Sequence, residues 1–427
     1  MKKSFLQNKD KKISKIFVVT GFIFIVFFSI YFAISIALSK TAAYTENDLL
    51  FGIDTIRVID DMTVFSADHY RTSVHPLYLL FINPWGVILK KIIGSKLLAA
   101  LAINSFFGAL GVGIAFLFFY TYGKTITNAA LLSSFFGISA SQVILSITPD
   151  TATLAICSLL GTYLLFLVSL KDQKNYLFLW ILIGIFSLGV TTSNFAQTFI
   201  CYTALVITQD SQKSVSKKVF SVLGYGLCVF MITFAFALFQ KTIYPSAGLF
   251  YLPVSIQDEM KYSSLLIFKE PFTVLFHLVK HFFVVNIISP LPTVFTLSGT
   301  FRHSPSITFS TTAEFGFIWW TGLILWITLY TTSLVHIWKN KTNRTLQITF
   351  LICFGFNFVL HSFYGVGERG LIEYFLYTGN FTFLLVSILT NLPLEKKKYL
   401  VVLLIGLILL VGENNFLALR EIYFIYR

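Results

Sequence analysis

Residues 47–78, NDLLFGIDTIRVIDDMTVFSADHYRTSVHPLY, gather side chains that are suited to acid–base and phosphate chemistry. The stretch holds five aspartates, two arginines and two histidines, whereas the whole chain has only 19 acidic residues in 427. A carboxylate can take the proton of an attacking hydroxyl, and a guanidinium can bind a phosphate through two hydrogen bonds. The cluster is therefore suited to a site for an anionic lipid headgroup and a hydroxyl nucleophile.

Three charged residues of this stretch have helical spacing. Asp54, Arg57 and Asp61 lie three and four residues apart, which places them on one face of a helix. The acids alternate with apolar residues, so we expect the segment to pack on the membrane surface rather than to extend freely into solvent. Positive and imidazole side chains follow just before the next apolar segment, at His69, Arg71 and His75.

Two more segments carry candidate residues. Asp150 in TPDTATLAI follows a proline at a predicted helix start, where the helix dipole stabilises an acid. Two interpretations of Asp150 stay open: it caps the helix, or it contacts a substrate. Residues 357–380 contain Glu368, Arg369 and Tyr377 at a predicted outer turn. An ordinary turn with an aromatic belt is one interpretation; the other is a phosphate-binding arginine with a tyrosine that stacks on a sugar.

The composition indicates which elements must position these residues. Hydrophobic residues make up 56% of the chain, charged residues 12%, and the mean hydropathy is +0.79. A soluble domain carries about 25% charge. The net charge of +13 does not indicate nucleic acid as a partner, because the lysines cluster between apolar runs, as in cytoplasmic loops. All four cysteines lie within apolar runs, which predicts neither disulfides nor a zinc site.

The apolar runs predict an all-α polytopic membrane protein with a single integral membrane domain and about eleven transmembrane helices. Each run is long enough to be considered for crossing a hydrocarbon core of ~30 Å. Residues 176–208 hold TTSN at their centre and predict two short or broken helices. The runs are 16–38, 96–122, 126–147, 150–170, 176–191, 194–208, 219–240, 315–338, 345–363, 371–391 and 399–415.

Charge asymmetry predicts the orientation in a plasma membrane. The first fifteen residues carry six lysines directly before the first apolar run, which places the amino terminus in the cytoplasm. With eleven crossings, the four later basic clusters also fall inside, and the carboxyl terminus falls outside. The candidate site in 47–78 then lies at the outer face.

Two long segments are expected outside the membrane, at 39–95 and 241–314. In the first, residues 75–96 are apolar, but Pro84 and Gly86 interrupt them, so we expect an interfacial helix along the outer face. In the second, an amphipathic helix is expected within 268–292. Its polar stripe, predicted to face water or headgroups, consists of His277, Lys280 and His281.

The layout resembles that of GT-C-type membrane glycosyltransferases, which include the protein O-mannosyltransferases and the lipid A aminoarabinose transferases. A long outer loop with early aspartates follows the first span, and residues 75–124 resemble the family's proline-initiated interfacial helix and second span. TPDTATLAI resembles the next outer turn. The resemblance covers about residues 16–170, with His75-Pro76 in place of a Pro-Pro pair.

The resemblance implies sugar transfer from a polyprenyl-phosphate donor to a cell-envelope acceptor, which is a glycan, a lipid or a protein. It implies an inverting reaction at the outer face with an aspartate base, for which Asp54 is the first candidate and Asp61 the second. Contact with the donor phosphate or substrate is assigned to Arg57, Arg71, His75, Asp150, Glu368, Arg369 and Tyr377.

No resident cofactor is predicted, and metal dependence stays open because the adjacent acids at 60 and 61 are of the type that holds a divalent ion. The rival interpretation is a transporter or flippase of a lipid-linked sugar, favoured by the uncharged break at 191–194. A third is an assembly subunit without chemistry.

Overall fold

The computed structural model describes all residues except 1, 210–213, 296–303, 310–315, 340–342 and 366–369. In the described part, helices dominate and one two-stranded sheet is present. Seven helices are long and apolar enough to cross a membrane, or eight if the bent pair of 126–147 is one span. The protein is therefore an all-α membrane protein with several spans, as predicted, and the count of eleven stays a prediction.

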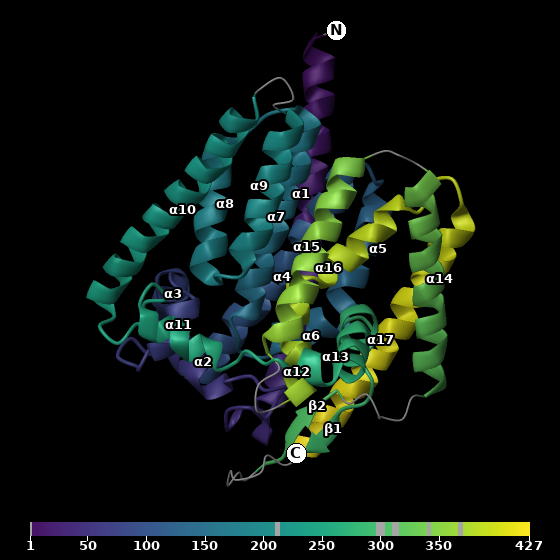
Figure 1. Ribbon diagram of the computed structural model, residues 1–427. Helices are drawn as coiled ribbons and strands as arrows, with labels where there is room; N and C mark the ends of the chain where they lie inside the picture. The colour runs from purple at the N-terminus through teal and green to yellow at the C-terminus, as the bar shows by residue number, and fades with distance from the viewer. Residues whose placement is uncertain (1, 210–213, 296–303, 310–315, 340–342, 366–369) are drawn as a thin grey trace.

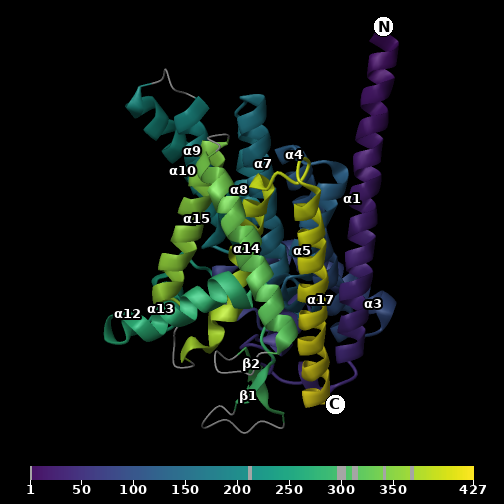
Figure 2. The same cartoon turned by 90° about the vertical axis from the view of Figure 1, so that its right-hand side faces the viewer.

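The seven long helices run roughly side by side (Figures 1 and 2). The amino terminus lies at one end of the bundle and the carboxyl terminus at the other, which we call the loop end. The helices are α1 (Lys2–Leu38), α4 (Lys96–Tyr122), α7 (Ala152–Asp172), α10 (Val215–Ile243), α14 (Phe317–Lys339), α15 (Arg344–Phe363) and α17 (Lys398–Tyr426).

Helices α4 and α7 form the centre of the bundle. Of the apolar 18-residue stretch of α7, 72% is buried within the protein, whereas only 17% of the corresponding stretch of α1 is buried. Large apolar residues left bare on α1, among them Phe17 and Phe22, are what a helix facing lipid presents. The core helices thus support the connecting turns, and the outer helices provide the surface toward the membrane.

The predicted run 126–147 is bent. It forms α5 (Ile126–Ile138) and α6 (Ala140–Ile147), which meet at 62°. The backbone N–H groups of Ala140 and Ser141, which the bend frees, donate to the carbonyls of Ile287 and Asn286. The second long connecting segment, 241–314, therefore supplies the hydrogen-bond acceptors for the break and packs against the bundle at this point.

The predicted break at TTSN is confirmed, because α8 (Leu177–Val190) and α9 (Asn194–Gln209) are two short helices on either side of it. The break packs against the first loop through two backbone hydrogen bonds. Leu77 N donates to Gly189 O at 2.7 Å, and Thr192 N donates to Val74 O at 3.1 Å.

The first loop contains η1 (Ala42–Tyr44), α2 (Thr55–Thr63), η2 (Tyr70–Val74) and α3 (Tyr78–Ile93). We expected Pro84 and Gly86 to interrupt this helix, but α3 continues through both residues. A Cβ atom at Gly86 would lie 1.9 Å from the carbonyl oxygen of Met62, so the glycine permits close contact with α2. Helix α3 is seen nearly end-on in Figure 1, where the long helices run up the page. Its exposed apolar residues, Trp85, Ile88 and Ile92, suit the predicted interfacial position.

The second long connecting segment holds α11 (Pro253–Met260), α12 (Leu266–Lys269), α13 (Pro271–Lys280) and the π-helical turn η3 (His281–Val285). Figure 2 shows α12 and α13 lying across the long helices. The prediction that His281 belongs to an exposed polar stripe is wrong. This residue is buried, and its Nδ1 makes a hydrogen bond with the carbonyl oxygen of His277. The bare face of α13 instead carries Phe272 and Phe276, which are 87% and 60% exposed.

The predicted run 371–391 is not one continuous α-helix. It begins as the 3-10 helix η4 (Gly370–Asn380) and continues as α16 (Thr382–Ile388) and η5 (Leu389–Asn391). Strands β1 (Thr293–Phe295) and β2 (Ser306–Thr308) pair antiparallel. Helix α17 extends past the predicted end at 415, and Tyr426 donates to the carbonyls of Leu49 and Pro305.

Candidate functional site

A tight turn at 48–53 anchors the first loop in the protein. Phe51 N donates to Ile307 O at 3.0 Å, and Ile307 N donates to Leu49 O at 2.8 Å, so the loop extends strand β2. Leu49 and Phe51 are fully buried in the main core. The apolar residues of the loop therefore pack into the protein, and not onto the membrane surface as expected.

Helix α2 begins in a way that leaves Asp54 available. Asp54 is the residue before the helix, yet its side chain makes no capping hydrogen bond. Asn47 Oδ1 takes that role and accepts from the N–H groups of Ile56 at 2.8 Å and Arg57 at 3.3 Å. The Asp54 carboxylate is 37% exposed and pairs with Arg57, whose Nε and Nη2 both lie 3.2 Å from Oδ2.

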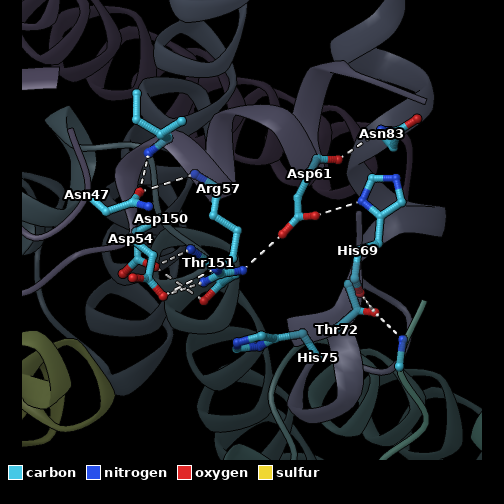
Figure 3. Close-up of polar contacts among 12 residues, drawn as sticks. Asn47, Asp54, Arg57, Asp61, His69, Thr72, His75, Asn83, Asp150 and Thr151 are labelled. Atoms are coloured by element: carbon cyan, nitrogen blue, oxygen red, sulfur yellow. Dashed lines mark hydrogen bonds and ion pairs between the residues drawn. The ribbon is translucent and has the colours of Figure 1, made fainter. Parts of the chain in front are cut away.

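A buried chain of polar contacts continues from Arg57 (Figure 3). Arg57 Nη1 lies 2.9 Å from Asp61 Oδ2, and Asp61 Oδ1 lies 2.7 Å from His69 Nδ1. Asn83 of α3 donates to the Asp61 carbonyl at 2.8 Å. These contacts confirm that Asp54, Arg57 and Asp61 share one helical face. Asp61 and His69 are buried beneath Arg57 and fix its position.

Arg71 is held by the second long connecting segment. Its Nη1 lies 2.9 Å from Oε1 of Glu259, and its guanidinium lies 4.8 Å from the ring centre of Tyr262. The hydroxyl of Tyr364 donates to the other Glu259 oxygen at 2.8 Å. Burial alone would lower the pKa of Arg71, but the Glu259 carboxylate raises it above its ordinary value. Arg71 therefore stays charged.

His75 approaches the same region from the turn before α3. Its Nδ1 lies 2.7 Å from the carbonyl oxygen of Val190, so Nδ1 carries a proton and the neutral ring has an acceptor at Nε2. Burial lowers the pKa of His75 to about 4. At neutral pH the ring is therefore uncharged in the ligand-free protein.

Asp150 lies in the turn between α6 and α7. The buried Asn104 of α4 holds this turn, because its Nδ2 donates to the carbonyls of Leu145 and Thr148. Asp150 Oδ1 accepts from Thr151 N at 2.7 Å, which is a local contact at the start of α7. Burial raises the pKa of Asp150 to about 6. This carboxyl is therefore protonated in mildly acidic conditions.

These side chains converge on one cavity of about 390 Å³, which we call the polar cavity. Asp61 does not line it, and Glu368 and Arg369 lie outside the described residues. Figure 3 shows Arg57, Asp54, Asp150 and the ring of His75 gathered on one side, with Asp61 between Arg57 and His69. The predicted residues that line the cavity are Asp54, Arg57, Arg71, His75, Asp150 and Tyr377.

Sequence reasoning missed other parts of the cavity wall. Glu259 lies far along the chain from Arg71, and no spacing within 241–314 indicated their pairing. Residues 191–193 line the cavity, although the sequence showed them only as a break between helices. His361, which falls within the segment 357–380, lines the cavity and stacks on Tyr377 with ring centres 4.4 Å apart.

A second cavity of about 700 Å³, the apolar cavity, lies between α14, α15, α16 and the end of α4. Phenylalanine, leucine and isoleucine dominate its wall, and Arg344 at the start of α15 is the only charged lining residue among those that the structure describes. Its described wall contains no carboxylate that could act as a base, so its larger volume does not make it the better candidate for chemistry.

No group of three or more His, Cys, Asp or Glu side chains in the described part of the chain is placed to hold a metal ion. The adjacent acids at 60 and 61 have different partners. Asp60 Oδ1 lies 2.8 Å from Lys96 Nζ, whereas the Asp61 carboxylate faces Arg57 and His69.

The fold and the cavity define a multi-pass, all-α membrane protein with a polar cavity between its two long connecting segments. No family model matches the chain, and no curated protein matches it. The functional assignment therefore depends on the chemistry of the cavity.

Proposed function

We propose that the protein is a membrane glycosyltransferase that transfers a sugar from a polyprenyl phosphate to a cell-envelope acceptor. The observation that carries this proposal is the polar cavity, in which a partly exposed carboxylate and two arginines meet in an otherwise apolar membrane protein. Clusters of interacting ionisable residues in a cleft commonly mark functional sites. We place the cavity at the outer face and retain eleven crossings, with the amino terminus in the cytoplasm.

Asp54 is the proposed base. The acceptor oxygen attacks the anomeric carbon while its proton passes to the Asp54 carboxylate. The bond between the anomeric carbon and the phosphate oxygen breaks, its electron pair stays on the lipid phosphate, and the configuration inverts. Asp54 suits this role because it lines the cavity and is 37% exposed.

Asp61 is assigned to positioning in this proposal, because both of its oxygens are engaged and it does not line the cavity. It holds Arg57 beside Asp54. The leaving phosphate is assigned to Arg57 and Arg71, whose planar guanidinium groups suit phosphate oxygens. Arg71 already pairs with Glu259, so the donor must compete with that carboxylate or bind the remaining N–H groups of Arg71.

A transporter of a lipid-linked sugar is the second candidate. The observation that favours it is the break between α8 and α9, whose residues 191–193 line the polar cavity. Transporters place substrate sites at such broken helices. These three residues carry no charge, whereas the acids and arginines come from connecting segments, which favours the transferase.

The test is sugar transfer by the purified protein in proteoliposomes, with a radiolabelled hexosyl or pentosyl polyprenyl phosphate and a membrane extract as the acceptor. Asp54→Asn should lower turnover by about 10²–10⁴-fold, the usual contribution of general base catalysis. Donor binding should change little, because the amide keeps the size of the carboxylate.

Asp60→Asn is the matched control. Asp60 lies on the same helix but pairs with Lys96 and does not line the polar cavity, so its loss should leave turnover within about twofold. Full activity of Asp54→Asn would remove the base from the proposal. Movement of the intact lipid-linked sugar across the bilayer without transfer would favour the transporter.

A further inference from the structure

His361 is a buried histidine on the wall of the polar cavity. It is 2% exposed, and neither ring nitrogen makes a hydrogen bond of normal geometry in the described part of the chain. Its ring is nevertheless well fixed. It stacks on Tyr377 with ring centres 4.4 Å apart and meets the edge of Phe282 at 6.2 Å. Aromatic packing therefore orients the imidazole and leaves its two polar atoms unused.

Buried polar atoms without partners are rare in proteins, because each loses its hydrogen bonds to water without replacement. They are expected where a ligand supplies the missing partner. His361 lines the cavity, and both ring nitrogens are shielded from solvent, so a ligand bound there reaches them once a neighbouring side chain shifts.

The chemistry of the ligand follows from the atoms that lack partners. A neutral imidazole offers one donor and one acceptor, and a hydroxyl group is both. A phosphate oxygen only accepts, and it would find its positive partners at Arg57 and Arg71 elsewhere on the wall. A polyol ring, which presents several hydroxyls at once, therefore fits the His361 side of the cavity better than an anion does.

We propose that His361 binds the hydroxyl groups of a sugar in the polar cavity and forms a sugar subsite apart from the two arginines. The proposal rests on the proposed glycosyltransferase function and deepens it, since it divides the donor between two parts of one cavity. The lipid phosphate lies toward Arg57 and Arg71, and the sugar ring lies toward His361.

The test is equilibrium binding of two probes to the purified full-length protein. One probe is farnesyl phosphate, and the other is the same lipid phosphate esterified with glucose, mannose or arabinose. His361→Phe keeps the aromatic packing and removes both hydrogen-bonding atoms. It should weaken binding of the sugar-bearing probe by about 10- to 100-fold, and binding of farnesyl phosphate should stay within about twofold.

Two variants provide controls. His361→Gln restores a donor and an acceptor and should recover part of the lost affinity. His281→Phe changes another buried histidine with an unpartnered Nε2 that does not line the polar cavity, so sugar binding should be unchanged. The melting temperature of ligand-free His361→Phe should stay equal or rise by about 1–3 °C, because an unsatisfied polar group is removed.

Unchanged sugar binding in His361→Phe would overturn the subsite and leave the glycosyltransferase proposal standing. An equal loss for both probes would also overturn it, because His361 would then act on the lipid phosphate or on the fold. If the wild-type protein binds neither probe, the proposed function fails and the subsite fails with it.

Discussion

The two cavities lie near opposite ends of α15 and differ in what they can hold. Arg344, at the first residue of the helix, lines the apolar cavity, whereas Leu360 and His361, near its last residue, line the polar cavity. The apolar cavity is larger, at about 700 Å³ against about 390 Å³, but its wall has a single charged residue among those that the structure describes. The polar cavity combines carboxylates, guanidinium groups and imidazoles. The comparison teaches that the types of lining residues, and not the volume, indicate where chemistry is possible.

The supports of the two cavities also differ. Aromatic packing surrounds the apolar cavity, as between Phe118 and Phe350 with ring centres 5.9 Å apart. The polar cavity stands on a chain of side chains that runs from the partly exposed Asp54 through Arg57 to the buried Asp61 and His69. Breaking one member of such a chain leaves a buried group without its partner.

The largest effect is therefore expected from Asp61→Ala. Asp61 is buried between Arg57 and His69, so its loss should lower the free energy of unfolding by about 3–5 kcal/mol. Asp60→Ala removes a partly exposed pair with Lys96 and should cost at most about 1 kcal/mol. Unfolding in mixed micelles of rising SDS content measures both. Equal costs would show that the buried chain does not support the cavity.

A smaller effect, on substrate binding, is expected from Arg71→Ala. The phosphate is charged in the ground state and in the transition state, so KM for the donor should rise by about 10- to 100-fold, with a smaller change in kcat. Steady-state transfer at varied donor concentration separates the two constants. A fall in kcat with unchanged KM would assign Arg71 to the transition state alone.

A still smaller effect is expected from pH. Burial raises the pKa of Asp150 to about 6, so below pH 6 the neutral carboxyl can donate a hydrogen bond to the phosphate, and above pH 6 its charge repels the phosphate. KM for the donor should therefore rise by about 3- to 10-fold from pH 5 to pH 7.5. Asp150→Asn, which stays neutral, should flatten this profile. The same rise in Asp150→Asn would exclude Asp150 as its source.

The smallest effect is expected from Arg344→Ala, which removes the charge from the wall of the apolar cavity. Transfer should stay within about twofold of wild type, because this residue is remote from the proposed reacting groups. The same steady-state assay compares it with Arg71→Ala. A loss as large as that of Arg71→Ala would show that the donor phosphate uses the apolar cavity.

Local sequence patterns predicted the helices well. Apolar runs identified the long helices, and the spacing of Asp54, Arg57 and Asp61 predicted the helical face that the ion pairs confirm. The kink between α5 and α6 could not be predicted from local sequence. The N–H groups that it frees donate to the carbonyls of residues 286 and 287, which are far away in the chain. The buried position of His281 was missed for a similar reason, since helical spacing does not tell which face meets the protein.

The site was predicted in part. Asp54, Arg71 and His75 were recognised from residue type within one loop, and all three line the polar cavity. The pairing of Arg71 with Glu259 joins residues that are far apart in the chain, and one sequence gives no signal for such a contact. Residue type also did not separate Asp54 from Asp61; burial and hydrogen bonds distinguish them.

The most direct test of the central claim is a cryo-electron microscopy structure of the Asp54→Asn protein bound to a sugar-bearing polyprenyl phosphate. We predict density for the phosphate beside Arg57 and Arg71, and density for the sugar beside His361, all within the polar cavity. Density for the phosphate beside Arg344 in the apolar cavity, with the polar cavity empty, would contradict the account.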